Sequence, residues 1–500
     1  MVTAHHRTTW RNLWDTLPGV WVMVVLAGVF FIVSKGAVAP NDFWWHVRAG
    51  QYMLQQRTLP TTDLFSFTRL GQPWIYQSWL TEVLFYLLNR AGGIPLLLLL
   101  KAIIITATYT LLLRTSLDRA DGNLRFAAFV TLFAAALGIT NTDLRPQVVT
   151  FPLLAWTLWC VIREERSPAH NGALWSLPPL FVLWANSHGG FIFGLALLAA
   201  STAGQLLDWL RKRESFPKRL LAVSLLCVAA VLVTPMGVGV VNYVLGFIRH
   251  PITSQLNQEF MPPSVRDLTG QLFFGLLGLF VVLLVVSRYR PRSSEALRVL
   301  MFAGLALSAA RCVVWFGFIA APVLAAALAY WTRERGKVNV PRPGLRLANR
   351  VLVGVMLILC VISLPWLRPY IPIPGTSTSF VTPETPEKAA EYLCTLGQQR
   401  PLKVYHTEGA GSYLIWVCPE IPVFIDTRIE LYPPEQWKDY IYVGHALYNW
   451  EELLAKYEVN ALLLQTDLHP ELIAAVTASP HWQRTYEDKI FVVFEQRGGT

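Results

Sequence analysis

The sequence predicts a multi-pass α-helical membrane protein of about eleven transmembrane helices, with a small soluble α/β domain at its C-terminal end. Its 500 residues are 54% hydrophobic and only 15% charged, whereas an average soluble protein has roughly 25% charged residues. Long apolar runs recur between short loops, and successive loops alternate in their content of Lys and Arg. From about residue 383 the composition becomes that of a soluble protein.

The membrane domain is expected to cover residues 1–368. The predicted spans are residues 18–38, 94–113, 126–140, 148–162, 173–187, 190–210, 220–234, 271–287, 298–310, 312–331 and 350–368. Several are shorter than the roughly 20 residues that cross a bilayer, so their ends are approximate. The first run follows a basic N-terminus (His5, His6, Arg7 and Arg11) and resembles a leader peptide. Pro40 disfavours cleavage after Ala39, and we expect a retained helix.

The charge of the loops predicts their sidedness. Five loops rich in Arg and Lys are expected to be cytoplasmic by the positive-inside rule; they are residues 114–125, 163–166, 211–219, 288–298 and 333–350. The N-terminus is then cytoplasmic, and the residues from about 369 onward are extracytoplasmic. The net charge of +10 reflects this topology, so the expected partner is the lipid bilayer, and no nucleic-acid partner is expected.

The first extracytoplasmic loop, residues 39–93, is expected to be structured along the membrane surface. Residues 45–56 and 77–88 have amphipathic patterns that suit helices in the interface. The turn sequences Thr61-Thr62-Asp63 and Gly71-Gln72-Pro73 lie between them.

Asp42 is the first candidate for chemistry, in Asn41-Asp42-Phe43-Trp44-Trp45-His46 directly after the first span. A carboxylate flanked by aromatic side chains just above the lipid is partly desolvated and can accept a proton from a hydroxyl group. The same residue is equally suited to cap a helix that begins at Phe43 or Trp44. The spacing leaves both interpretations open.

Asp63 and Glu82 are candidates for a second carboxylate in this loop. Asp63 is more typical of a turn residue in its Thr-Thr-Asp context. Glu82 lies on an otherwise apolar helix face near the membrane, where a carboxylate without a partner is costly. Glu82 is therefore the stronger of the two candidates.

The later outer loops contain further polar residues. Arg145 can offer a forked donor to a phosphate, or pair with Asp143 in a tight turn. Asn186 and His188 lie in Asn-Ser-His-Gly-Gly between two spans, where the glycines permit close approach of backbone or ligand. In this tight hairpin, the pattern is compatible either with contact between these two residues and a substrate or with a structural role for them.

Arg311 and Glu259 complete the outer set. Arg311 interrupts an apolar stretch and needs an anion, either a protein carboxylate or a lipid phosphate, unless it extends to the interface. Glu259 is more typical of a solvated charge than of a ligand-binding residue. Together, the outer residues suit a ligand that combines an anionic lipid head group with a hydroxyl-rich part.

The C-terminal domain, residues 369–500, is expected to alternate strands and helices. The strands are 402–406, 423–426, 461–465 and 490–494, and the helices are 434–442, 450–457 and 470–477. Residues 408–412 lack the Lys of a phosphate-binding loop and are expected to form a tight turn. Asp426 and Arg428 predict an internal ion pair, with contact to a glycan as the alternative. A disulfide between Cys394 and Cys418 is compatible with an oxidising compartment.

Several motifs form one pattern. They are Asn41-Asp42-Phe43-Trp44-Trp45-His46-Val47, Gly50, Pro60, Asp63-Leu64-Phe65-Ser66, Gly71, Trp74, Trp79-Leu80-Thr81-Glu82, Arg145-Pro146, Asn186-Ser187-His188-Gly189-Gly190, Pro235-Met236-Gly237 and Glu259. This pattern resembles bacterial membrane glycosyltransferases of the GT-C superfamily, which includes protein O-mannosyltransferases and aminoarabinose transferases. Many relatives have a second acidic residue where this chain has Asn41. Because of this difference, the resemblance does not decide whether a divalent cation such as Mg or Mn is a cofactor.

The resemblance implies an inverting glycosyltransferase of the bacterial inner membrane. It would move a sugar from a polyprenyl-phosphate donor to an extracytoplasmic glycan, lipid or protein acceptor. Asp42 occupies the position of the catalytic base, and the expected substrate-binding residues are His46, Asp63, Glu82, Arg145, Asn186, His188, Glu259 and Arg311. The alternatives are a non-catalytic cell-envelope assembly protein and a transporter of lipid-linked glycans, although a transporter would place polar residues near the middle of the membrane.

Overall fold

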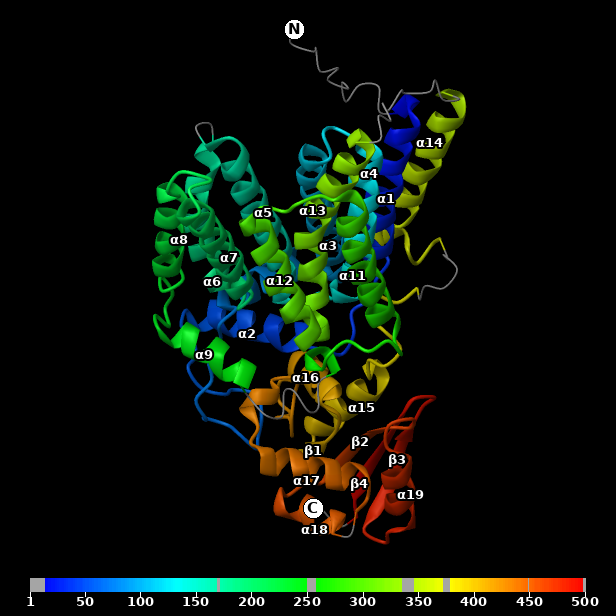
Figure 1. Ribbon diagram of the computed structural model, residues 1–500. Helices are drawn as coiled ribbons and strands as arrows, with labels where there is room; N and C mark the ends of the chain where they lie inside the picture. Colours follow the sequence, from blue (N-terminus) through cyan, green and yellow to red (C-terminus); the bar gives the residue numbers. More distant parts are fainter. Residues whose placement is uncertain are drawn as a thin grey trace. The chain divides into compact units, whose positions relative to one another are not determined.

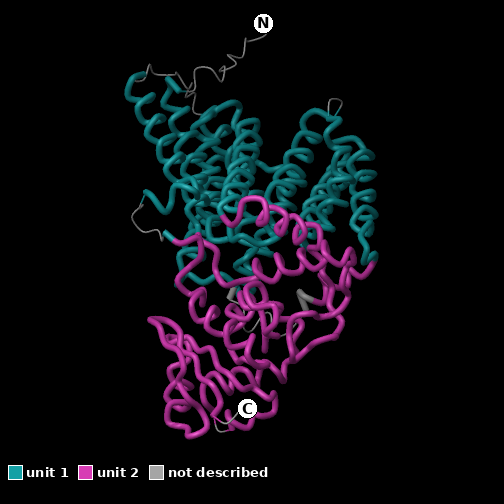
Figure 2. The backbone as a smooth tube through the Cα atoms, turned by 180° about the vertical axis from the view of Figure 1, so that it is seen from behind, with its two compact units in different colours: residues 1–36, 95–237, 257–378 teal, residues 37–94, 238–256, 379–500 magenta. Residues whose placement is uncertain are grey.

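The computed structural model describes residues 14–168, 171–249, 258–334, 346–371, 378–447 and 449–497. The chain divides into two compact units (Figure 2). Unit 1 comprises Met1–Gly36, Pro95–Gly237 and Asn257–Thr378, and unit 2 comprises Ala37–Ile94, Val238–Leu256 and Ser379–Thr500. This division differs from the expected boundary at residue 368, because the first outer loop groups with the C-terminal residues. The basic residues before residue 14, and Arg335, Lys337 and Arg342, lie outside the described residues.

Unit 1 is a bundle of helices (Figure 1). Its helices are α1 (Leu17–Ser34), α4 (Leu124–Gly138), α5 (Thr150–Arg166), α6 (Leu177–Ser187), α7 (Phe191–Leu210), α8 (Lys218–Ala230), α11 (Leu268–Ser287), α12 (Ser293–Ser308), α13 (Val313–Glu334), α14 (Arg346–Ile362) and the larger part of α3 (Trp79–Arg119). Helix α1 packs against α4 and α14, and α6, α7 and α8 pack together. The Ala-rich helix α13 contacts α4, α11 and α12, and its apolar segment is entirely buried. A helix that is apolar all round belongs in such a central position.

Six helices among the described residues are long and apolar enough to cross a membrane. They are Leu17–Ser34, Trp79–Arg119, Leu124–Asn141, Phe191–Leu210, Leu268–Ser287 and Ala310–Glu334. The other five expected spans correspond to α5, α6, α8, α12 and α14, which have 17, 11, 13, 16 and 17 residues. The protein is therefore an integral membrane protein, and the count of eleven spans stays a prediction.

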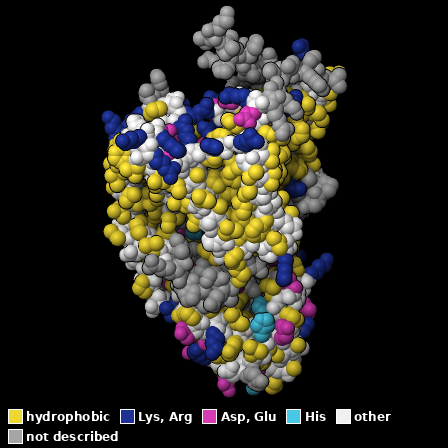
Figure 3. All heavy atoms as spheres, viewed as in Figure 1, with side chains coloured by type: hydrophobic (Ala, Val, Ile, Leu, Met, Phe, Trp, Pro, Cys, Tyr) yellow, Lys and Arg dark blue, Asp and Glu magenta, His cyan; other side chains and the backbone are white. Residues whose placement is uncertain are grey.

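The basic loops meet at one end of unit 1. Ion pairs join them to one another: Arg119 with Glu295, Arg298 with Glu165, Arg219 with Glu164, Arg333 with Asp121, and Arg350 with Asp15. Figure 3 shows Lys and Arg side chains gathered at this end of the bundle, beyond a hydrophobic belt. The expected outer loops meet at the other end, where Arg145 pairs with Glu259. The predicted alternation of loops is thus present within unit 1.

Unit 2 contains a four-stranded sheet of order β1-β2-β4-β3. Strand β1 (Val404–Tyr405) is parallel to β2 (Ala461–Gln465), whereas β4 (Phe491–Gln496) is antiparallel to both β2 and β3 (Trp482–Glu487). The helices around it are α15 (Glu387–Gly397), α16 (Glu408–Val417), α17 (Pro434–Gly444), α18 (Trp450–Lys456) and α19 (Pro470–Ala478). Three expected strands and three expected helices correspond to β1, β2, β4, α17, α18 and α19.

Two expectations for this region were wrong. Residues 423–426 do not form a strand of the sheet, because Val423 makes only isolated bridges, to Val404 and Ser66. The expected tight turn at 408–412 instead begins helix α16, where the side chain of Thr407 accepts a hydrogen bond from the backbone N–H of Ala410. A Thr at this N-cap position satisfies a donor of the first helical turn. Strand β3 was not predicted.

The first outer loop and the C-terminal residues fold together within unit 2. Helix α2 (Phe43–Gln56) packs against α16, and the backbone N–H of Phe67 donates to the carbonyl of Val423 at 3.0 Å. Val38 likewise forms a parallel bridge with Val381. These contacts explain why the loop does not group with the membrane helices.

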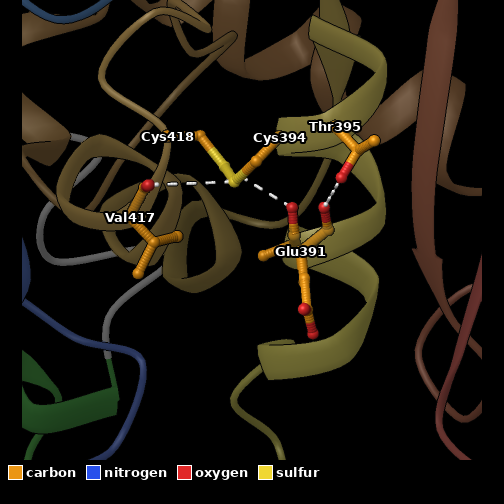
Figure 4. Close-up of a disulfide and its surroundings, with 6 residues drawn as sticks. Glu391, Cys394, Thr395, Val417 and Cys418 are labelled. Atoms are coloured by element: carbon orange, nitrogen blue, oxygen red, sulfur yellow. Dashed lines mark hydrogen bonds between the residues drawn. A yellow bond between two sulfur atoms is a disulfide. The ribbon is translucent and has the colours of Figure 1, made fainter. Parts of the chain in front are cut away.

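A disulfide links Cys394, in α15, to Cys418, which follows α16 (Figure 4). The two Cα atoms are 5.4 Å apart, within the range that a disulfide spans. Disulfides persist mainly in oxidising compartments, which agrees with the expected extracytoplasmic location of these residues.

Gly50 provides a test of the packing in unit 2. It lies in α2, where a Cβ atom would overlap the backbone carbonyl of Glu82. We expect Gly50→Ala to destabilise the full-length protein by about 1–3 kcal/mol, because overpacking forces the backbone apart. Thermal unfolding in detergent, followed by tryptophan fluorescence, measures this. Gly28→Ala, in α1 where nothing lies within 4 Å, is the matched control; equal unfolding temperatures for the two variants would contradict the prediction.

Candidate functional site

Asp42 lies at the N-cap position of α2 but does not cap it. The helix begins at Phe43, and among the described residues the Asp42 side chain makes no capping hydrogen bond. Instead, the side-chain oxygen of Asn41 accepts from the backbone N–H of Phe43 at 3.1 Å. The capping interpretation of Asp42 was therefore wrong, because Asn41 makes the capping hydrogen bond.

His46 and Glu82 form a buried pair. His46 Nδ1 lies 2.8 Å from Glu82 Oε1, and the imidazole stacks on the ring of Trp45 with centroids 3.6 Å apart. The second carboxylate oxygen of Glu82 is buried and has no hydrogen-bond partner among the described residues. The pairing gives Glu82 the partner that a carboxylate in apolar surroundings requires.

Asp63 and Asp426 hold the fully buried guanidinium of Arg428. Arg428 Nη2 lies 2.6 Å from Asp63 Oδ1 and 2.6 Å from Asp426 Oδ2, and Arg428 Nε donates to Asp426 at 2.9 Å. Aromatic rings surround the cation, those of Trp45, Phe65 and Trp74, at 5.2–5.6 Å. The expected Asp426–Arg428 ion pair is thus present.

Asp63 has a turn role as well as this ion pair. Its carboxylate accepts hydrogen bonds from the backbone N–H groups of Phe65 and Ser66 and from the Ser66 hydroxyl. Asp63 therefore orders its own turn and neutralises Arg428 at the same time. This geometry gives Asp63 a structural function, and its assignment to substrate stays a prediction.

Glu430 and Tyr243 belong to this region, although sequence reasoning missed both. Tyr243, in α9 (Gly239–Arg249), donates its hydroxyl to Glu430 Oε1 at 2.8 Å. Burial, together with the charge of Asp42, raises the pKa of Glu430 to about 7, while the Tyr243 hydrogen bond and Arg428 act in the opposite direction. The only sequence signal was the position of Glu430 two residues after Arg428.

In unit 1, Arg145 pairs with two carboxylates. Its Nη2 lies 2.8 Å from Asp143 and 2.7 Å from Glu259. The expected local pair with Asp143 is present, and Glu259, which was expected to be a solvated charge, is 36% exposed and pairs with Arg145. Burial alone would raise the pKa of Glu259, yet the charges of Arg145 and Arg311 outweigh it, and the pKa lies below its ordinary value.

Arg311 is held at the same end of the bundle. Its Nη2 donates to the side chain of Gln147 at 3.3 Å, and its guanidinium carbon lies 4.4 Å from the ring centroid of Phe260. An Arg stacked on an aromatic ring keeps its hydrogen-bonding edge oriented. Arg311 and Arg145 therefore bring two guanidinium groups to the segment that contains Glu259.

His188 is oriented by its neighbours. Its Nδ1 accepts from the backbone N–H of Gly190 at 3.0 Å and lies 2.8 Å from the Thr150 hydroxyl. Because Nδ1 accepts, the neutral ring carries its proton on Nε2. A Cβ atom at Gly190 would overlap the Thr150 hydroxyl, which accounts for the glycine. Asn186 donates to the carbonyls of Val182 and Val233.

The segment 145–150 connects these residues. Arg145 binds Glu259, Gln147 binds Arg311, and Thr150 contacts His188. Unit 1 thus brings together four predicted residues at one end of its bundle, while unit 2 contains Asp42, His46, Asp63 and Glu82. Sequence reasoning missed Gln147 and Thr150, whose place beside Arg145-Pro146 was the available signal.

The described residues contain one group of three side chains with the spacing of metal ligands. It consists of Cys394, Cys418 and Glu420, and its two sulfur atoms form the disulfide. This group does not fit a metal site, because a disulfide sulfur is not a thiolate ligand. The use of a divalent cation stays a prediction without assigned residues.

Comparison with known proteins identifies the fold. No protein-family model and no curated protein matches the chain. The structure is similar to crystallised ArnT from Cupriavidus metallidurans in the apo state, with a TM-score of 0.54 and 13% identity over 94% of this chain and 96% of that one. It is also similar to the oligosaccharyltransferase AglB from Archaeoglobus fulgidus in complex with an inhibitory peptide and a dolichol-phosphate, with a TM-score of 0.49 and 13% identity over 96% of this chain and 75% of that one.

The comparison establishes the fold of the chain. The chain therefore shares its fold with ArnT, a fold that agrees with the resemblance in its sequence. A shared fold does not by itself assign a reaction, so the activity has to be argued from the residues.

Proposed function

We propose that this protein is a GT-C glycosyltransferase of the bacterial inner membrane that moves a sugar from a polyprenyl-phosphate donor to an extracytoplasmic acceptor. The chain would span the membrane about eleven times, with a cytoplasmic N-terminus and the residues from about 369 onward outside. The acceptor is a glycan, a lipid or a protein. The disulfide between Cys394 and Cys418 supports the outward location of the C-terminal residues.

The proposed transfer is a single displacement with inversion at the anomeric carbon. The acceptor oxygen bonds to that carbon while its O–H bond breaks and the proton passes to Asp42. The bond from the anomeric carbon to the phosphate oxygen breaks, and its electron pair leaves with the polyprenyl phosphate. Positive groups that bind this phosphate stabilise the developing charge.

The observation that carries the proposal is the capping of α2 by Asn41. Because Asn41 satisfies the first helical turn, the neighbouring carboxylate of Asp42 can serve as a base without loss of the helix. The buried His46–Glu82 pair supports the same helix from within. We assign Arg145, Arg311 and His188 to binding of the donor phosphate. Glu259 would orient Arg145, and Asn186 would maintain the shape of the hairpin in which it lies.

A donor panel tests the proposed activity. The purified full-length protein is incubated with a series of polyprenyl-phosphate sugars and a candidate acceptor, and the release of polyprenyl phosphate is measured. We expect release with at least one donor, and we expect it to depend on Asp42. Release that persists without Asp42 would exclude this mechanism, and no release with any donor would favour a non-catalytic assembly role.

Arg145 is expected to contribute to donor binding. Replacing it with Lys keeps a positive charge but removes the forked geometry that matches a phosphate. We expect the KM for the donor to rise about 10-fold or more, since a hydrogen bond between charged groups contributes about 1.5–3 kcal/mol. Steady-state kinetics measures this, with Arg125→Lys, at the basic end of unit 1, as the control. An unchanged donor KM would remove Arg145 from the phosphate site.

A further inference from the structure

Three segments of unit 2 meet around Trp74. The ring centroids of Trp74 and Tyr243, which lies in α9, are 6.0 Å apart. The guanidinium carbon of Arg428 lies 5.2 Å from the centroid of the Trp74 ring. The ring of Trp45, in the first turn of α2, lies 5.6 Å from the same guanidinium. The start of α2, helix α9 and the segment after Asp426 are therefore neighbours.

This arrangement holds Glu430 in a defined position. Arg428 is fixed by the buried carboxylates of Asp63 and Asp426, and Glu430 follows it by two residues in the turn Ile429–Leu431. The hydroxyl of Tyr243 donates to Glu430 Oε1 at 2.8 Å. Glu430 is thus placed by the short helical turn that follows Arg428 and by the Tyr243 hydrogen bond.

The groups that act on Glu430 come from three elements. Asp42 at the start of α2 is a like charge, Arg428 on its own segment is an opposite charge, and Tyr243 on α9 is a hydrogen-bond donor. Asp42 and Glu82 act on Tyr243 as well. A negative charge on one of two neighbouring carboxylates makes the other a stronger proton acceptor.

We propose that Glu430, held by Tyr243, is a positioning residue that acts through Asp42, and that its negative charge strengthens Asp42 as the base for glycosyl transfer. This inference rests on the proposed function, and it gives the C-terminal residues a part in the reaction. It also supplies, from a distant position in the chain, the second acidic group that Asn41 does not provide. Glu430 tunes Asp42 without contacting the substrate.

The sign of the pH dependence follows from the raised pKa of Glu430. Below about pH 7 Glu430 is neutral, whereas ordinary glutamates are ionised. As the pH rises through this value, Glu430 becomes negative and Asp42 becomes the stronger base. The transfer rate of the wild type is therefore expected to rise about 3- to 10-fold across a step centred near pH 7.

Two variants give different signatures in the pH profile. Glu430→Gln imitates the neutral form, so its activity should equal the low-pH level of the wild type without the step. Tyr243→Phe removes the hydrogen bond that lowers the pKa of Glu430, so the step should move to higher pH. Glu435→Gln, at an exposed carboxylate in the first turn of α17, should keep the wild-type profile.

If Glu430 had only a structural role, Glu430→Gln would have a lower activity at every pH, and the step in its pH profile would stay at the wild-type position. That result, or a step that persists in Glu430→Gln, would overturn the inference.

A direct titration separates this inference from the proposed function. Infrared difference spectra of the full-length protein, recorded against pH, follow the Glu430 carboxyl group as the signal that is absent from Glu430→Gln. Burial is the main cause of the raised pKa of Glu430 and the charge of Asp42 adds to it, so the midpoint should fall in Asp42→Asn. An unchanged midpoint would refute the coupling even if Asp42→Asn abolished transfer. If the midpoint of the Glu430 titration fell in Asp42→Asn but the wild type used none of the donors, the coupling between Glu430 and Asp42 would stand. The proposed glycosyltransferase activity would be refuted.

Discussion

Asp42→Asn is expected to reduce glycosyl transfer by at least about 100-fold, which is the lower range for loss of a general base. The amide is nearly isosteric with the carboxylate but cannot accept a proton at neutral pH. The KM for the donor should change little, because we assign the donor phosphate to residues of unit 1. Release of polyprenyl phosphate by the purified variant measures both quantities.

The stability of Asp42→Asn should be close to that of the wild type. Asn41, rather than Asp42, accepts the hydrogen bond from Phe43, so the helix end is unaffected. Asn41→Ala is the contrasting control: it removes the cap, which contributes about 1 kcal/mol, and should lower the unfolding temperature while transfer stays within a few-fold of the wild type. Near-normal turnover by Asp42→Asn would end the assignment of the base.

Arg428→Ala is expected to have the largest effect on stability. The guanidinium is fully buried between two buried carboxylates, and its removal leaves Asp63 and Asp426 without a counter-charge in apolar surroundings. Breaking a buried ion pair on one side costs about 3–5 kcal/mol. For unfolding of a unit of the size of unit 2, this corresponds to a decrease in the unfolding temperature of at least about 6 °C, which thermal unfolding of the full-length protein measures.

Arg428→Lys should recover only part of this loss, because a Lys side chain cannot donate in the fixed fork that reaches both carboxylates. Arg484→Ala is the matched control, since Arg484 pairs with Glu487 on the exposed surface, where an ion pair contributes about 0–1 kcal/mol. If the unfolding temperatures of Arg428→Ala and Arg484→Ala were the same, the buried pair would have no part in stabilising unit 2.

The organisation of unit 2 changes how the C-terminal residues are understood. They do not form a separate domain appended to the membrane helices, because the first outer loop supplies α2, Asp63 and a backbone partner for Val423. A substitution at Arg428 is therefore expected to disturb the surroundings of Asp42, although more than 380 residues separate them in the sequence.

The membrane character, the alternation of the loops and the polar residues in them followed from the sequence alone. The transfer of an apolar segment from water into the lipid bilayer and the placement of Lys and Arg in cytoplasmic loops both depend on local composition. Local composition can be read directly from the sequence. The helices of the first loop were predicted for the same reason, because amphipathic periodicity is a local pattern. The Asp143–Arg145 and Asp426–Arg428 pairs were also accessible, since their members are two residues apart.

Only the tertiary structure decided which residues meet across long distances in the chain. Asp63 with Arg428, Tyr243 with Glu430, and Arg145 with Glu259 depend on how helices and loops pack, which no local pattern encodes. The segment 423–426 reads as a strand because it is apolar, but the edge of β1 offers it only one bridge, at Val404. The role of Asp42 changed for a similar reason: the spacing allowed Asp42 to cap α2 or to accept a proton, and in the structure Asn41 accepts the hydrogen bond from Phe43 instead.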